Sequence, residues 1–143
     1  MTDPLNPKDL IGQTKVPLEI WPASATAMGA VGLYEGLSKY GRENYLATPV
    51  RASIYVAAAK RHIDAWFEGE DNSPEGVPHL GNAIACLAIL VDAGTHNTLV
   101  DDRRYTGPEA YRALLKQLTG VVEKLQKDHQ DKAPKHYHKG VSK

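Results

Sequence analysis

The fold class of this chain follows from one stretch, PHLGNAIACLAILVDA, which spans residues 78–93. From Ala83 to Val91 it is apolar on every side, a pattern typical of a helix that other elements cover all round. Gly94 comes next, as glycine commonly does after the last turn of a helix. The apolar run is too short to cross a membrane. We therefore expect a central helix from Pro78 to Ala93, the most buried element of the chain.

A second helix is predicted over Ala23–Tyr40, ending before Gly41. Its interior holds Gly29, Gly32 and Gly36. Each glycine inside a helix costs about 1 kcal/mol relative to alanine. The sequence therefore predicts that another element packs very close to this helix.

Two further helices complete the predicted architecture. One has Thr48 as its cap and Pro49 in its first turn, and it ends before Gly69. The other runs over residues 108–128 and carries a clean amphipathic stripe. Residues 1–22 contain four prolines and are expected to form an extended arm or loop. Because no segment shows β alternation, the predicted fold is all-α, a bundle of about four helices.

The length of 143 residues suits a single domain, expected over residues 1–128. The lone cysteine, Cys86, excludes a disulfide framework and fits a reducing compartment. The N-terminus has no signal-peptide pattern, so a cytoplasmic location is expected. Residues 129–143 form a basic tail with too little apolar content to order itself. Nucleic-acid binding would need a basic stripe, and only the lysine-rich end of the chain could supply one.

Acidic side chains crowd between His62 and Asn82, where no Lys or Arg occurs. Hard divalent cations such as Mg²⁺ bind oxygen ligands, usually a few carboxylates together with substrate phosphates. Carboxylates at the end of one helix and the start of the next would converge if those helices pair antiparallel. A cation site is one interpretation of this stretch. A solvated acidic loop beside a core histidine is the other.

The segment from Glu35 to Tyr45 is a second candidate for chemistry. Glu35 and Lys39 are four residues apart, which is ordinary support for a helix. Lys39 and Arg42 also lie beside a glycine and two aromatic residues. Such a group could hold a phosphate chain and stack a base.

Four blocks of sequence, in this order, resemble the phage dATP/dGTP diphosphohydrolase family, part of the MazG-like all-α nucleoside triphosphate pyrophosphatase superfamily. The blocks are Lys15-x-Pro17-Leu18-x-Ile20-x-Pro22, Lys39-Tyr40-Gly41-x-x-Asn44-Tyr45, Arg61-His62-x-x-Ala65-Trp66-x-x-Gly69-Glu70-Asp71 and Glu75-Gly76-x-x-His79-Leu80-x-x-Ala83. The resemblance covers about residues 13–93.

The resemblance implies hydrolysis of a purine (deoxy)nucleoside triphosphate, dGTP and/or dATP, to the monophosphate by water attack at the α-phosphorus. It implies Mg²⁺ as cofactor, with Mn²⁺ as a substitute, and a homo-oligomer, either a dimer or a tetramer. One branch of the family, MazZ, works in phages that replace adenine with 2-aminoadenine. A member of that branch would act in the host-cell cytoplasm, without membrane or nucleic-acid partners.

The chain departs from the superfamily pattern of EExxE on one helix and ExxD at the start of the next. It has Arg61-His62 and His79-x-x-Asn82 at those places. The expected metal ligands are Glu35, Glu70, Asp71, Glu75 and His79, and the three residues Glu70, Asp71 and Glu75 are the expected catalytic carboxylates. The departure also leaves open an alternative, a non-catalytic helical binding or assembly module that keeps the fold without the metal site.

Substrate contacts are expected from residues in all four blocks. Lys39 would hold the phosphate chain with help from Lys15 and Arg61, whereas Asn44, Tyr45 or Trp66 would contact the base. The full expected set of substrate-binding residues is Lys15, Lys39, Tyr40, Asn44, Tyr45, Arg61, His62, Trp66 and Asn82.

Overall fold

The structure is a computed structural model that describes residues 6–140. The described residues divide into two compact units, one ending at Asp101 and one beginning at Asp102. The predicted single domain over residues 1–128 stays a prediction, and each unit is described by itself. None of the helices in the described part of the chain is long and apolar enough to span a membrane.

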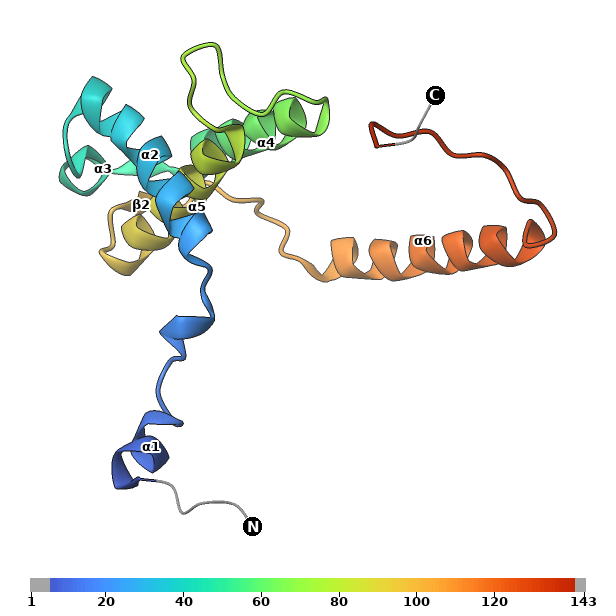
Figure 1. Cartoon of the computed structure of the whole chain (residues 1–143), viewed down its shortest axis with the longest axis horizontal. Helices are drawn as coiled ribbons and strands as arrows, with labels where there is room; N and C mark the ends of the chain where they lie inside the picture. Colours follow the sequence, from blue (N-terminus) through green and yellow to red (C-terminus); the bar gives the residue numbers. More distant parts are fainter. Residues whose placement is uncertain (1–5, 141–143) are drawn as a thin grey trace. The chain divides into compact units, whose positions relative to one another are not determined.

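Three helices build the first unit. They are α2 (Ala23–Tyr40), α4 (Ala52–Phe67) and α5 (His79–Thr95). The helix α5 packs against both of the others (Figure 1). The predicted all-α class and the central place of the apolar helix are therefore confirmed.

The close approach that the glycines of α2 predict is also present. Gly29 and Gly32 are buried in α2, and Gly81 is buried in the first turn of α5. The helix α2 ends at Tyr40, as predicted. Its C-cap is Gly41, whose φ of 89° is a left-handed value that glycine adopts without strain.

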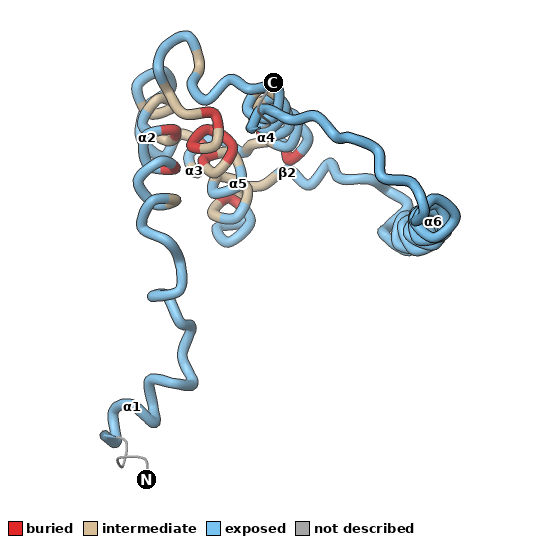
Figure 2. Tube along the Cα trace, turned by 45° about the vertical axis from the view of Figure 1, so that its right-hand side comes forward, coloured by how far each residue is buried: buried red, intermediate tan, exposed pale blue. Residues whose placement is uncertain are grey.

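The core of this unit is made of small side chains. Its buried apolar residues are Tyr45 and five alanines, and no large side chain among the described residues is fully buried. Figure 2 shows that the buried residues gather where α2, α4 and α5 meet. The expectation that α5 is covered on every side is wrong, because Leu87 is 50% exposed and Val91 71% exposed.

A short parallel strand pair corrects the predicted start of α4. The strand β1 (Val50–Arg51) pairs in parallel with β2 (Leu99–Val100). The helix therefore begins at Ala52, with Arg51 as its N-cap, and the predicted start at Thr48 and Pro49 is wrong. Thr48 instead ends the short helix α3 (Asn44–Ala47) in an extended conformation. The N–H of Val50 bonds to the carbonyl of Thr98, which lies far away in the sequence. Capping preferences depend on neighbouring residues, so they cannot predict this partner.

The N-terminal arm is more ordered than predicted. It contains α1 (Pro7–Gly12) and a 3₁₀ turn, η1 (Leu18–Ile20), and every described residue before Ala23 is exposed. The side chain of Asn6 accepts a hydrogen bond of 2.9 Å from the backbone N–H of Lys8, which caps α1.

The second unit consists of one helix and irregular segments. The helix α6 (Glu109–Asp128) agrees with the predicted fourth helix to within one residue, and none of its residues is buried. Its apolar stripe, which includes Leu114, Leu118 and Val122, is about half exposed. After α6, residues 129–140 contain neither helix nor strand.

Candidate functional site

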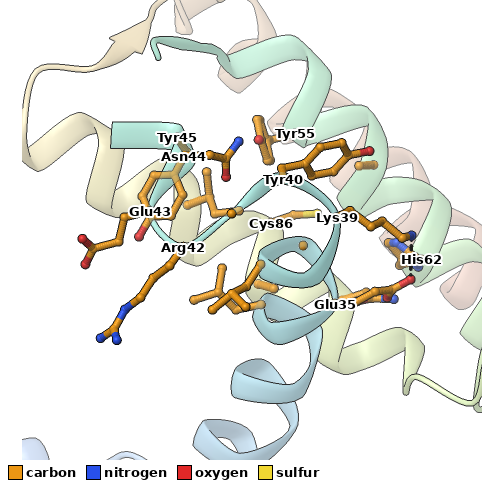
Figure 3. Close-up of a pocket in the computed structure, with 18 of the residues that line it drawn as sticks. Glu35, Lys39, Tyr40, Arg42, Glu43, Asn44, Tyr45, Tyr55, His62 and Cys86 are labelled. Atoms are coloured by element: carbon orange, nitrogen blue, oxygen red, sulfur yellow. Dashed lines mark hydrogen bonds and ion pairs between the residues drawn. The ribbon is translucent and has the colours of Figure 1, made fainter. Parts of the chain in front are cut away.

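A cavity of about 590 Å³ opens among the helices of the first unit. Its walls come from the C-terminal half of α2, the turn after it, α3, and the facing sides of α4 and α5 (Figure 3). Most of the expected substrate-binding residues line it, namely Lys39, Tyr40, Asn44, Tyr45, Arg61, His62 and Asn82.

Two expected substrate-binding residues lie elsewhere. Lys15 lies in the exposed segment between α1 and η1, and Trp66, in the last turn of α4, is 42% exposed. Neither of them lines the cavity. The cavity is also lined by residues that the sequence did not mark as part of the site, among them Tyr55 and Cys86. Tyr55 lies seven residues before His62, so helical spacing places both on one face and could have identified it.

The turn after α2 brings Arg42 and Asn44 to the cavity. Gly41 and Glu43 both have positive φ, 89° and 58°, so the chain reverses within a few residues. The N–H of Gly41 still bonds to the carbonyl of Leu37 at 2.9 Å, which closes α2 before the turn. The short helix α3 then starts at Asn44, beside the end of α2.

Lys39 and Glu35 form an ion pair in which Nζ and Oε1 are 3.0 Å apart. The hydrogen bond from Lys39 lowers the pKa of Glu35. Partial burial raises this pKa, and a hydrogen bond with Asn82 lowers it again. The same bond raises the pKa of Lys39. The Lys39 side chain is 57% exposed, so its charge is accessible to a ligand in the cavity.

Tyr45 is anchored by its hydroxyl. It is only 8% exposed and donates a hydrogen bond of 2.8 Å to Oδ2 of Asp92 on α5. Burial, and then this bond to Asp92, raise the pKa of Tyr45 to about 12. The Tyr45 hydroxyl is therefore already bonded within the protein.

Two histidines meet between α4 and α5. The Nδ1 atoms of His62 and His79 are 3.0 Å apart, and Nε2 of His79 lies 2.5 Å from Oε1 of Glu70. His79 is 6% exposed, whereas His62 lines the cavity. Burial, and next the neighbouring His79, lower the pKa of His62.

Of the five side chains expected to bind a metal, Glu70 and His79 contact each other, but the five do not form one cluster. Glu70 is bonded to His79 and Glu35 to Lys39, while Asp71 and Glu75 are exposed. Across residues 6–140, no three His, Cys, Asp or Glu side chains lie close enough together to hold a metal ion. The described side chains of one chain thus do not fit a metal centre by themselves.

Comparison with known proteins decides the family. The model of the dATP/dGTP diphosphohydrolase N-terminal domain matches residues 6–103. The chain belongs to the dATP/dGTP diphosphohydrolase family. No curated protein and no solved structure matches it. The predicted family and the predicted enzyme class, a nucleotide pyrophosphohydrolase, are confirmed, and the matched residues include the whole lining of the cavity.

Proposed function

We propose that this diphosphohydrolase binds a purine deoxynucleoside triphosphate, dATP and/or dGTP, in the cavity among α2, α3, α4 and α5 and hydrolyses it to the monophosphate and pyrophosphate. The observation that carries the proposal is the lining of that cavity, which combines basic side chains with tyrosine rings and an amide. A nucleotide presents the complementary groups, namely a phosphate chain and a flat base.

The phosphates are best accommodated at the end of the cavity where Lys39, Arg61 and His62 lie. Figure 3 shows Lys39, Glu35 and His62 together on one side, with Asn44 and Tyr45 on the other. A triphosphate would compete with Glu35 for the ammonium group of Lys39, because both offer anionic oxygens. The tyrosine rings and the Asn44 amide are then left for the base, since an amide both donates and accepts hydrogen bonds.

The reaction that we propose is an in-line attack of water on the α-phosphorus. The water oxygen forms a bond to phosphorus and gives up a proton to a base at the cavity or to solvent. The bond to the bridging oxygen breaks, and pyrophosphate leaves with that electron pair. Lys39 and Arg61 would stabilise the negative charge that gathers on the phosphate oxygens. Positioned charge of this kind is commonly the largest contribution that an enzyme makes to phosphoryl transfer.

Dependence on Mg²⁺, with Mn²⁺ as a substitute, follows from the resemblance and is proposed on that ground. Mg²⁺ is usually bound through one or two carboxylates plus substrate phosphates. Because the described side chains of one chain do not assemble a metal centre, no step of the reaction is assigned to the ion. A role in a phage with a 2-aminoadenine genome is proposed on the same resemblance.

We also propose that the protein is a homo-oligomer, a dimer or a tetramer. Apolar side chains on the helices of the first unit are widely exposed, for example Val31 at 50%, Ile54 at 60% and Val91 at 71%. The stripe on α6 adds further exposed apolar area. Exposed apolar patches of this extent mark interaction surfaces, and the symmetric association of identical chains is the commonest way to cover them.

Hydrolysis in ¹⁸O-labelled water tests the proposed reaction. Purified protein is incubated with each of the four deoxynucleoside triphosphates and Mg²⁺, and the products are analysed by mass spectrometry. Attack at the α-phosphorus places the label in the monophosphate, whereas attack at the β-phosphorus places it in pyrophosphate. We expect labelled dAMP and/or dGMP. Nucleotide binding without any product would instead support the non-catalytic alternative.

A further inference from the structure

Three side chains form a continuous hydrogen-bonded row that ends at the cavity. Glu70, in the loop after α4, contacts His79 in the first turn of α5, and His79 contacts His62 on α4. Only His62 of these three lines the cavity. The row thus connects a 56% exposed carboxylate, through a buried imidazole, to a residue that faces the proposed nucleotide site.

The number of protons fixes the direction of these hydrogen bonds. An ionised carboxylate can only accept, so Nε2 of His79 must carry the hydrogen that is donated to Glu70. A neutral imidazole has one N–H, which leaves Nδ1 of His79 as an acceptor. The hydrogen between the two Nδ1 atoms therefore belongs to His62, and Nε2 of a neutral His62 keeps a free lone pair.

The surroundings of His62 favour the neutral form of its imidazole. Burial, His79 and Arg61 lower its pKa, and Glu35 on α2 acts in the opposite direction without reversing the result. Lys39, on the same side of the cavity as His62 (Figure 3), is held by Glu35. With one N–H on each imidazole, the two bonds of the row require the Nδ1–H tautomer of His62.

We infer that Glu70 and His79 act as positioning residues that hold His62 with Nε2 as an acceptor toward the cavity, where it receives a hydrogen bond from the attacking water. Phosphate oxygens also only accept, so an unprotonated Nε2 is repelled by them and selects a donor. Water is the donor that the hydrolysis requires beside the phosphates. This inference rests on the proposed function for the reaction, but the tautomer itself belongs to the free protein.

The tautomer can be read directly by ¹⁵N NMR of the imidazole rings in the free protein at pH 8. We expect Nδ1–H for His62 and Nε2–H for His79, with the signals assigned from a His62→Gln variant. In Glu70→Leu the row loses its acceptor, and His62 should shift toward the Nε2–H form. Glu68→Leu, at an exposed position two residues earlier, serves as the control and should leave both signals unchanged. Nε2–H on His62 in the unsubstituted protein, or no response to Glu70→Leu, overturns the inference.

Kinetics then test the link to the water. Glu70→Leu should lower kcat with an unchanged KM, and its melting temperature shows that it is folded. His62→Phe should lower kcat by about 100-fold or more, the usual contribution of a group that handles a proton of the attacking water. His62→Gln, whose amide oxygen can take the place of Nε2, should recover part of that loss. If the tautomers are as inferred but kcat is unchanged in all three variants, the role toward water is overturned while the proposed hydrolysis stands. If neither the unsubstituted protein nor any variant hydrolyses nucleotide, the proposed function fails. The NMR measurement still decides the tautomer in that case.

Discussion

The Cβ atom that Gly32 lacks would lie 2.5 Å from the carbonyl oxygen of Gly81. The reverse also holds, because a Cβ at Gly81 would collide with the carbonyl of Met28 one turn earlier on α2. The backbones of α2 and α5 therefore touch at this crossing, with no side chain between them. This contact sets the position of α2 beside α5, and hence the position of Glu35 and Lys39, one and two turns further along α2, in the cavity.

Alanine at Gly32 should destabilise the fold. The added methyl group meets backbone atoms, which cannot move aside as a flexible side chain can. We expect a loss of about 1–3 kcal/mol in the free energy of unfolding, the usual cost of overpacking, measured by urea denaturation. Gly36→Ala is the matched control on the same helix. Nothing lies within 4 Å of its Cβ position, so this change should stabilise the helix by about 0.5–1 kcal/mol.

Lys39→Ala should weaken nucleotide binding without unfolding the protein. Its ammonium group lines the cavity and is accessible, so its loss removes a positive charge from the proposed phosphate site. A rise in KM for dATP or dGTP by about tenfold or more is expected for one charge-assisted hydrogen bond. Lys60→Ala, on the exposed side of α4, should leave KM unchanged. A lower melting temperature with unaltered kinetics would show that Lys39 only supports the helix through Glu35.

Tyr45→Phe should destabilise the fold by about 0.5–1.5 kcal/mol, because it removes the hydrogen bond that Asp92 accepts from the hydroxyl. The ring stays in place, so nucleotide affinity should change little. Thermal unfolding gives the first quantity and equilibrium binding the second. A large loss of affinity with full stability would mean that the hydroxyl contacts the nucleotide instead.

Tyr45 also predicts a dependence of stability on alkaline pH. Its pKa is raised from 10 in the unfolded chain to about 12 in the fold. A group with a raised pKa contributes stability that is fully present below its unfolded pKa and is lost as pH rises through the folded value. The difference in stability between the unsubstituted protein and Tyr45→Phe should therefore shrink between pH 10 and pH 12. Other groups titrate in both proteins, so their effects cancel in the difference.

Activity should require a divalent cation and disappear in excess EDTA. Because the described side chains of one chain hold no group of three metal ligands, we expect Mg²⁺ to raise the melting temperature only when a non-hydrolysable nucleotide is present. Bound ligand at one hundred times its dissociation constant stabilises a fold by about 2.7 kcal/mol. Glu35→Gln, which removes a carboxylate from the cavity lining, should reduce this stabilisation, whereas Glu123→Gln on α6 should not. Undiminished turnover in EDTA would exclude the cofactor.

A substitution that introduces a negative charge into the apolar stripe of α6 tests the proposed homo-oligomer. Leu118 is 47% exposed, and Leu118→Glu should reduce the molar mass measured by light scattering if this stripe is an interface. Gln117→Glu adds the same charge at the neighbouring position and should leave the mass unchanged. A monomer in the unsubstituted protein would contradict the proposal.

The sequence alone determined the features that depend on neighbouring residues. The bounds of α2, the end of α4 before Gly69 and the extent of α6 follow from caps, glycines and helical periodicity, all of which act within one or two turns. The glycines of α2 predicted a close neighbour, since a helix tolerates them only where their small size is used. The family resemblance also followed from blocks of sequence, and the family match confirms it.

Only the tertiary structure decided which distant residues meet. The pairing of Val50 with Leu99 moved the start of α4, and the contact of His62 with His79 paired two side chains that the sequence placed in separate roles. The same packing bonded Glu70 to His79, whereas the ion pair of Glu35 with Lys39 lies within α2 at the four-residue spacing that the sequence already contains. The sequence gives the chemical type of each side chain, but the partner of that side chain depends on how the helices cross. The crossing is set by packing contacts between distant segments, which a local sequence pattern does not contain.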